Sequence, residues 1–168
     1  YTRNGSDNQF SLEAKMAAIE HAQDCALFAS GVAALSAVFW TFLPTGSHVI
    51  CSKVCYAAVN KLFGGMLTER YQIEADFVDT TDINEIKAHI KENTKLIHVE
   101  TPGNPTTGIS DISEISKFAK AHNIILSVDG TFASPIYQKP LDLGADISIH
   151  SMTKQKIERT ETTVRSSL

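Results

Sequence analysis

The residues from Ser148 to Lys154, SIHSMTK, run from a short apolar–polar alternation into two hydroxyl groups and an amine. Ser151 and Thr153 can donate hydrogen bonds to an anion, and the amine of Lys154 can react with a carbonyl carbon once it has lost its proton. Taken alone, a lysine in such a place is usually an ordinary solvated side chain. Chemistry at Lys154 therefore needs support from other residues of the chain.

Polar side chains end two other strand-like runs. The run KLIHVE ends at Glu100 and leads into TPGNP, which contains Asn104, and the run IILSVD ends at Asp129. In a parallel α/β sheet the carboxyl ends of the strands share one edge, where ligands bind. Each of these side chains taken singly fits a solvated loop. A metal site fits them poorly, because no histidine accompanies the carboxylates at ligand spacing.

The stretch FASGVAALSAV, which begins at Phe28, places small residues at a turn that opens a helix. The backbone amides of Gly31 and Val32 would point toward an anion, with the positive end of the helix dipole behind them. Ser151 and Thr153 would add hydroxyl donors to this phosphate cradle. The alternative is a tight strand-to-helix turn in which Gly31 serves only packing.

An amine, a buried carboxylate and a phosphate cradle are the combination that pyridoxal phosphate requires. A lysine bonds covalently to the cofactor's aldehyde, and a carboxylate keeps its pyridine nitrogen protonated. An aromatic ring stacked on the cofactor strengthens the binding. Tyr56, which follows the strand-like run HVICS, is placed to supply this ring, and its alternative role is half-buried packing.

Strand-like runs alternate with helical patterns along the chain. The runs HVICS, ADFVD, KLIHVE, IILSVD and DISIH (residues 48–52, 75–79, 95–100, 124–129 and 146–150) are predicted strands. Strands separated by helices indicate βαβ units. The predicted fold class is therefore α/β, with a mostly parallel sheet covered by helices on both faces.

Three helices are predicted from apolar stripes and capping residues. Asp82 and Asp111 are each followed three residues later by a glutamate, in the manner of a capping box, and isoleucines follow on one face. Leu12, Met16 and Ile19 form a third stripe. The uncharged segment 26–43 is interrupted by a serine and a glycine, which favours a strand feeding a buried helix over a membrane span.

Composition limits the classes of function. The chain has 168 residues, of which 43% are hydrophobic and 20% charged, with a net charge of -4, which is enough for one globular domain. A mildly acidic chain offers no basic face to nucleic acid or to an anionic membrane. Cys25, Cys51 and Cys55 lack zinc-site spacing, so we interpret them as reduced thiols of a cytoplasmic protein. Because Tyr1 is not an initiator methionine, the N-terminus is expected to be processed, trimmed or missing.

Several motifs in order give the chain a family resemblance. It resembles the central part of the pyridoxal-phosphate enzymes of cysteine and methionine metabolism, the group of cystathionine γ-lyase and methionine γ-lyase. The matching stretches are YTR at Tyr1, FASGVAA at Phe28, ETPGNP at Glu100, VDGTFASP at Val128 and PLDLGADISIHSMTK at Pro140. The resemblance implies the large domain of a fold-type I enzyme over residues 1–154, followed by a divergent polar tail over residues 155–168. It also implies that a C-terminal substrate domain is absent.

The resemblance implies a role for each matching residue at the cofactor. Lys154 would be the lysine that bonds to the cofactor, Asp129 the partner of its ring nitrogen, and Tyr56 the stacked ring that also helps activate substrate. Asn104 would lie near the phenolic oxygen of the cofactor. The phosphate would be held by Gly31, Val32, Ser151 and Thr153.

The resemblance also implies an assembly. In the family, the tyrosine and arginine of the YTR motif reach the phosphate of the neighbouring subunit. Tyr1 and Arg3 would then make the protein a homodimer or homotetramer with sites shared across the interface.

The sequence departs from the family at the predicted site. Ala57 and Val59 stand where small glycines and a threonine are usual, and Gly130 stands where the family commonly has an asparagine, so the orientation of Asp129 is less secured. The polar tail after Lys154 replaces a glycine-containing stretch of the family.

The implied function is a carbon–sulfur lyase acting by α,γ- or α,β-elimination on cystathionine, methionine or cysteine. Two alternatives stay open. One is a γ-replacement transferase of the cystathionine γ-synthase or O-acylhomoserine sulfhydrylase type, and the other is a truncated cofactor-binding remnant without turnover.

Overall fold

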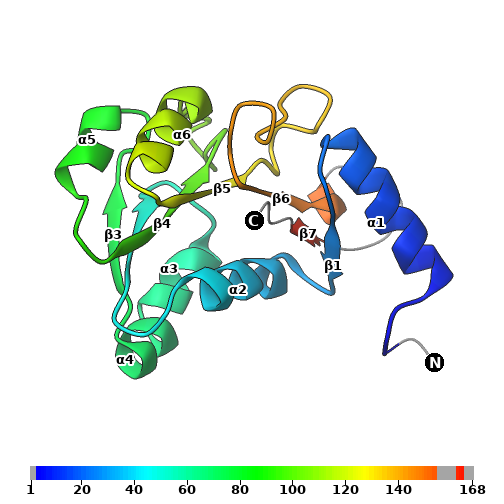
Figure 1. The fold of residues 1–168 in the computed structure, drawn as a ribbon, viewed down its shortest axis with the longest axis horizontal. Helices are drawn as coiled ribbons and strands as arrows, with labels where there is room; N and C mark the ends of the chain where they lie inside the picture. The colour runs from blue at the N-terminus through cyan, green and yellow to red at the C-terminus, as the bar shows by residue number, and fades with distance from the viewer. Residues whose placement is uncertain (1–2, 155–161, 165–168) are drawn as a thin grey trace.

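Seven strands form one sheet in the computed structural model, which describes residues 3–154 and 162–164 (Figure 1). The strands are β1 (Ala26–Phe28), β2 (His48–Ser52), β3 (Glu74–Val78), β4 (Thr94–Glu100), β5 (Ile125–Asp129), β6 (Ile147–Ser151) and β7 (Thr162–Val164). Their order across the sheet is β1-β7-β6-β5-β4-β2-β3. Neighbours from β3 to β6 are parallel, whereas β7 is antiparallel to both β6 and β1. The predicted α/β class with a mostly parallel sheet is confirmed.

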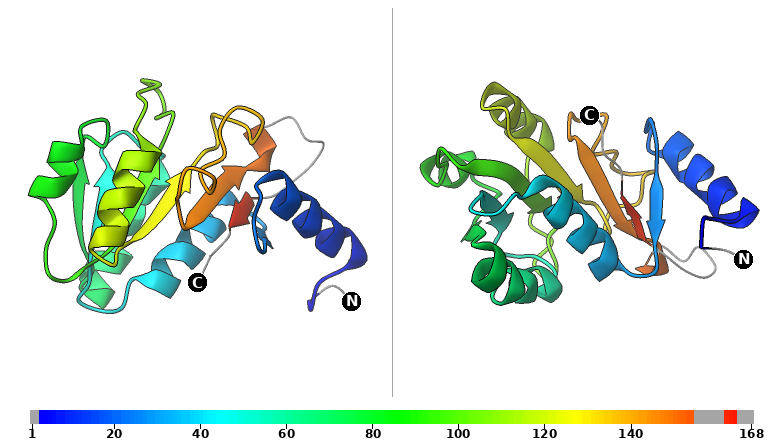
Figure 2. Two further views of the ribbon diagram at one scale, coloured as in Figure 1. Left: turned by 45° about the horizontal axis from the view of Figure 1, so that its top comes forward. Right: turned by 60° about the horizontal axis from the view of Figure 1, so that its bottom comes forward.

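Helices cover both faces of this sheet. They are α1 (Asp7–Ile19), α2 (Gly31–Phe42), α3 (Ala57–Phe63), α4 (Met66–Tyr71), α5 (Ile83–Ala88) and α6 (Ile112–Ala121), with a short 3₁₀ helix η1 at Met152–Lys154. Figure 1 shows α2, α3 and α4 beneath the sheet and α5 and α6 above it. The further views in Figure 2 place α1 beside β1, at the opposite end of the sheet from α5.

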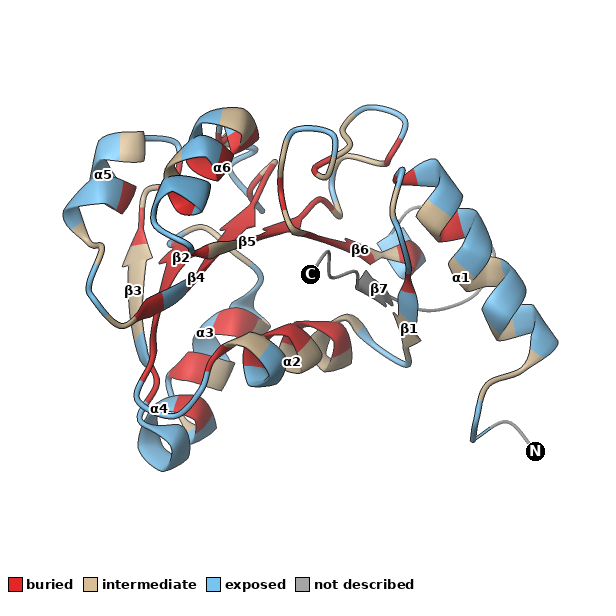
Figure 3. Cartoon of the chain, viewed as in Figure 1, coloured by how far each residue is buried: buried red, intermediate tan, exposed pale blue. Residues whose placement is uncertain are grey.

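Alternate residues of the central strands enter two separate cores, because successive side chains of a strand point to opposite faces. Val49 and Cys51 pack with Phe39 and other residues of α2, α3 and α4. Ile50 packs on the opposite face with residues of α5 and α6, among them Ile115. Figure 3 shows the result: β2, β4, β5 and β6 are almost entirely buried, as are the sheet-facing sides of the helices. Such strands require near-continuous apolar runs, as the sequence has.

The bounds of the predicted strands differ from the observed ones by at most one residue. The segment 26–43 forms β1 and α2 as predicted, and none of the helices in the described part of the chain has the length and apolar character needed to cross a membrane. Two apolar stripes are shorter than predicted. Ile19 is 45% exposed at the end of α1, and α5 ends before Ile90.

One strand was not predicted, because β7 lies within the segment expected to be a polar tail. β7 pairs on one side with β6, where Thr163 is opposite His150, and on the other with β1, where Thr163 is opposite Leu27. Residues 162–164 are therefore part of the sheet.

The connections reverse direction between β2 and β4. The chain passes from β2 outward to the edge strand β3 and then returns to β4 on the other side of β2. Crevices at such a reversal, outside the carboxyl ends of the strands, are where open α/β sheets bind ligands. The residues that follow β2, β4, β5 and β6 converge at this edge.

Candidate active site

A cavity of about 270 Å³ lies at the carboxyl ends of β2, β4, β5 and β6. Most of the residues predicted to hold a cofactor line it: Gly31, Val32, Tyr56, Asn104, Asp129, Ser151 and Lys154. Thr153 is exposed and Arg3 is exposed at the start of the chain, and neither lines the cavity. Tyr1 lies outside the described residues. The fold thus brings together groups that are far apart in the sequence.

The start of α2 forms one wall of this cavity. Ser30 is the N-cap, and its side chain accepts a hydrogen bond from the amide of Ala33 at 3.2 Å. The Ser30 carbonyl accepts from the amide of Ala34 at 3.1 Å. The amides of Gly31 and Val32 lie in the first turn, where amides have no acceptor within the helix. These amides and the helix dipole form an anion cradle at the edge of the cavity.

Asp129 closes the inner end of the cavity. Its side chain is only 7% exposed, and Oδ1 accepts a hydrogen bond from the amide of Thr131 at 2.9 Å. Burial raises the pKa of Asp129, while the bonds from Thr131 and the charge of His150 act in the opposite direction. A carboxylate whose charge is penalised by burial favours a cationic partner, and a protonated pyridine nitrogen is one. The Thr131 amide orients Asp129 where the family's asparagine is missing.

Gly130 permits a close approach between this segment and β6. A Cβ at this position would lie 2.9 Å from Cε1 of His150, and the Gly130 amide donates to the carbonyl of Ile149 at 2.9 Å. His150 is itself buried, with Nε2 2.6 Å from Oε1 of Glu20. The absence of a side chain at Gly130 therefore lets the buried histidine pack against the strand end that carries Asp129.

Glu100 ends β4 directly beside Asp129, with which it is in register. Only 8% of Glu100 is exposed, and burial followed by the charge of Asp129 raises its pKa to about 7. The same surroundings act on Cys55, where burial and then the charges of Glu100 and Asp129 raise the pKa to about 12. The Cys55 thiol is therefore protonated at neutral pH and is no nucleophile.

Lys154 enters the cavity from η1, directly after β6. Met152 is completely buried and anchors this turn, and the amide of Ser151 donates to Oγ1 of Thr131 at 2.8 Å. The Lys154 side chain is exposed, and among residues 3–154 and 162–164 no carboxylate forms an ion pair with it. Its amine is thus available to a reactant in the cavity.

Tyr56 stands at the N-terminal end of α3 with its ring 47% exposed on the cavity wall. Its amide donates a hydrogen bond of 2.5 Å to Oε2 of Glu100. A half-exposed ring that borders a cavity is able to stack on a flat ligand.

Sequence reasoning did not assign four polar or aromatic residues of the cavity wall: Ser30, Glu100, Thr131 and Phe132. Ser30 could have been found as the N-cap of α2, and Thr131 as the residue two positions after a strand-end aspartate, where Asx turns form. Glu100 was noted only as a strand end. Phe132, which is 50% exposed, carries no signal in a single sequence.

No group of three or more histidine, cysteine, aspartate or glutamate side chains that could hold a metal ion occurs within the described ranges. Cys25, Cys51 and Cys55 are free thiols in this structure. An amine, a buried carboxylate, an anion cradle and an aromatic ring in one cavity fit pyridoxal phosphate.

Comparison with known proteins gives the same result. The family model of Cys/Met metabolism PLP-dependent enzymes matches residues 1–156. The chain is 51% identical over 154 residues to a canavanine γ-lyase of Rhizobium leguminosarum bv. trifolii, covering 92% of this chain and 38% of the relative. It is 43% identical over 155 residues to an L-methionine γ-lyase of Fusobacterium nucleatum subsp. polymorphum, covering 92% and 39%.

The fold is also that of a solved enzyme. The crystal structure of cystathionine γ-lyase from Lactobacillus plantarum complexed with L-serine superimposes with a TM-score of 0.93 at 37% identity, covering 100% of this chain and 44% of that one. The chain therefore spans about two fifths of the length of the curated relatives it matches.

Proposed function

Because the chain belongs to the family of Cys/Met metabolism PLP-dependent enzymes, we propose that it forms the cofactor-binding part of a lyase that cleaves the side chain of an amino acid. The observation that supports this most directly is the shared cavity of Lys154, Asp129 and the amides of Gly31 and Val32. These groups come from three separate stretches of the chain and match three separate groups of the cofactor.

Each residue has a definite task in this proposal. Gly31 and Val32 bind the cofactor's phosphate through their amides, with Ser151 beside them. Asp129 would be the partner of the ring nitrogen and would favour its protonated form, and Tyr56 would supply the aromatic ring that stacks on the cofactor. When bound, pyridoxal phosphate supplies a protonated ring that withdraws electrons from the substrate's α-carbon.

Lys154 and two further residues complete the assignment. Lys154 would supply the amine that holds the aldehyde of the cofactor, and the same amine would serve as the general base toward the substrate. Asn104 would supply an amide side chain to the phenolic oxygen and the substrate carboxylate. Thr153 is the least supported of the predicted phosphate ligands, because it does not line the cavity.

Elimination at the γ-carbon is the reaction that the relatives favour. The relative at 51% identity is a canavanine γ-lyase and that at 43% is an L-methionine γ-lyase. We therefore propose a substrate with a leaving group on the γ-carbon, with methionine, cystathionine and canavanine as the first compounds to test. β-Elimination from cysteine or cystathionine and γ-replacement remain alternatives.

The first prediction concerns the covalent bond at Lys154. Purified protein mixed with pyridoxal phosphate should develop a visible absorption band, and Lys154→Ala should abolish it while leaving the fold intact by circular dichroism. Lys139→Ala is the matched control, because Lys139 lies outside the cavity and should leave the band unchanged. A band of equal strength in the Lys154→Ala variant would contradict the assignment.

Products then distinguish the reactions. Elimination from methionine should release methanethiol, ammonia and 2-oxobutanoate, whereas β-elimination from cystathionine should release pyruvate. Formation of a thioether from an added thiol would favour the transferase. Cofactor binding without any of these products would support the remnant without turnover.

We further propose that the protein assembles as a homodimer or homotetramer in the cytoplasm. Large apolar side chains support an assembly: Ile136 is 85% and Tyr137 87% exposed in the loop after β5. Three thiols without a disulfide support a reducing compartment.

A further inference from the structure

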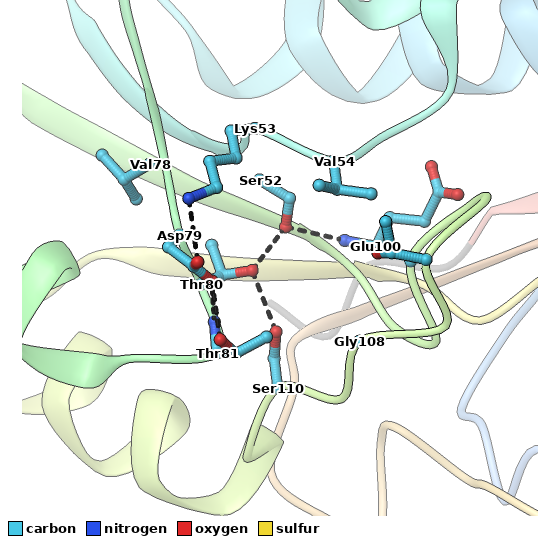
Figure 4. Close-up of a pocket in the computed structure, with 12 residues that line it drawn as sticks. Ser52, Lys53, Val54, Val78, Asp79, Thr80, Thr81, Glu100, Gly108 and Ser110 are labelled. Carbon is cyan, nitrogen blue, oxygen red and sulfur yellow. Dashed lines mark hydrogen bonds and ion pairs between the residues drawn. The ribbon is translucent and has the colours of Figure 1, made fainter.

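A second cavity, of about 310 Å³, lies beside the candidate site at the carboxyl ends of β2, β3 and β4 (Figure 4). Most of the residues that line it are polar, and they include an ion pair of 2.8 Å between Nζ of Lys53 and Oδ2 of Asp79. Glu100 is the one described residue that lines both cavities. It therefore lies between the two cavities.

Three buried hydroxyl groups hold the main chain of Glu100 from the side of the second cavity. The amide of Glu100 donates to Oγ of Ser52 at 3.2 Å, Ser52 and Thr80 are 2.7 Å apart, and Thr80 and Ser110 are 2.9 Å apart. Figure 4 shows this hydroxyl row running away from Glu100 across the ends of three segments. The row ties the end of β4 to the end of β2, to the segment after β3 and to the segment before α6.

The carboxylate of Glu100 points away from the hydroxyl row (Figure 4). Oε2 accepts from the amide of Tyr56 at 2.5 Å, and Oε1 accepts from the amide of Asn104 at 3.2 Å. Each oxygen thus binds a different loop. An ionised carboxylate has an acceptor at each of its two oxygens, so it can accept from both backbone N–H groups. A glutamine side chain of the same shape would turn its NH₂ group, which is a donor, toward one of these two N–H groups.

We propose that Glu100 is a positioning residue, whose carboxylate joins the main chains of Tyr56 and Asn104 and so sets the width of the cofactor cavity between the stacking ring and the amide side chain. The inference rests on the proposed function, which gives Tyr56 and Asn104 their contacts with the cofactor. A carboxylate at this position is costly in free energy, because it is buried beside the second carboxylate of Asp129. A role in stability alone does not require a charged group at this position.

Glu100→Gln tests the proposal with little change in volume. In cofactor-free protein, the ¹H–¹⁵N signal of the Tyr56 or the Asn104 amide should shift strongly and exchange faster with solvent, because one of the two bonds is lost. The dissociation constant for pyridoxal phosphate should rise about tenfold, as expected for one hydrogen bond to a charged group. The visible band should persist because Lys154 is unchanged.

Two further variants make the comparison specific. Glu92→Gln removes the same charge from an exposed position and should change neither the two amide signals nor the affinity. Ser52→Ala keeps the carboxylate but removes the acceptor of the Glu100 amide, and should weaken cofactor binding less than Glu100→Gln does. Unchanged amide signals and unchanged affinity in Glu100→Gln would overturn the proposal.

Titration of the unaltered protein covers the case in which Glu100→Gln fails to fold. As the carboxylate gains a proton, the amide signals of Tyr56 and Asn104 should move together with one midpoint, and independent midpoints would overturn the proposal. The ionisable groups that line the two cavities with Glu100 are Lys53, Tyr56, Asp79, Asp129 and Lys154, and the thiol of Cys55 lies close to Glu100 as well. Absence of the visible band in the unaltered protein would instead contradict the proposed function, and the amide signals would still decide the role of Glu100.

Discussion

At the scale of single residues, the site contains two carboxylates whose ionised forms are destabilised by burial. Asp129 and Glu100 end adjacent strands in register, and burial raises the pKa of both. A sequence reader finds Asp129 because a buried carboxylate beside a reactive lysine has a known chemical use. Glu100 could not be assigned in the same way, because its partners are backbone amides and no side-chain pattern reveals them.

A buried histidine on β4 leads to a prediction about pH. His98 is fully buried, with Nδ1 2.8 Å from Oγ of Ser127, and burial lowers its pKa from 6.5 to about 4. The unfolded chain binds a proton at this residue between those values, while the folded chain does not. The free energy of unfolding therefore keeps its full value above pH 6.5 as far as His98 is concerned. Protonation of His98 in the unfolded chain lowers that free energy by about 3 kcal/mol as the pH falls from 6.5 to 4.

Urea unfolding at several pH values, with His98→Gln as the comparison, measures this contribution. The difference in unfolding free energy between the unaltered protein and the variant should grow by about 3 kcal/mol from pH 4 to pH 7. Glu100 acts in the opposite direction, since its raised pKa makes stability fall between pH 4.5 and about 7. It does so in both proteins and so cancels in the difference. A difference independent of pH would contradict the assignment of His98 as a buried neutral group.

At the scale of elements, the strands and helix starts could be predicted because local signals agree with the fold. Four of the five long strands, β2, β4, β5 and β6, are buried runs with clear ends. Asp111 caps α6 as predicted, with Oδ1 accepting from the amide of Glu114 at 2.9 Å. Asp82 also caps its helix, but its side chain binds the amide of Asn84 and not that of Glu85. β7 could not be predicted, because a three-residue polar strand is stabilised by its two neighbours and not by its own side-chain pattern.

The cap of α6 can be tested directly. Asp111→Ala removes the acceptor for the Glu114 amide and should lower the unfolding free energy by about 1 kcal/mol in urea titrations. Asp111→Asn keeps an acceptor oxygen and should stay within a few tenths of a kcal/mol of the unaltered protein. Equal losses in the two variants would show that the charge at the helix start, and not the hydrogen bond, is what matters.

At the scale of the whole molecule, Arg3 is a predicted phosphate contact that the single chain does not bring to the cavity. Arg3 is exposed and outside the cavity, as the proposed sharing of sites between subunits requires, and the same position would result if Arg3 had no role. The sequence alone could imply this sharing only through a family resemblance, since contacts between subunits leave no periodic pattern.

Mixed assemblies separate these two possibilities. Arg3→Ala and Lys154→Ala should each weaken or abolish the visible band when expressed alone. Co-expression of the two should restore the band in roughly a quarter of the sites, because a dimer of one chain of each kind contains one intact site. A mixture that shows no more band than the sum of the separate variants would contradict sites shared across the interface.

The position of β7 between β1 and β6 also determines the order in which the strands can pair during synthesis. During synthesis, β2 to β6 can assemble as soon as they leave the ribosome, since each pairs with a strand already made or made soon after. β1 is made early but has no partner in the sheet until residues 162–164 arrive. Helix α2 packs on β2, β4 and β6 and can take its place without β7, so β1 is the element that reaches its final position late. A nascent chain stalled before β7 should carry a formed sheet in which β1 is still unpaired.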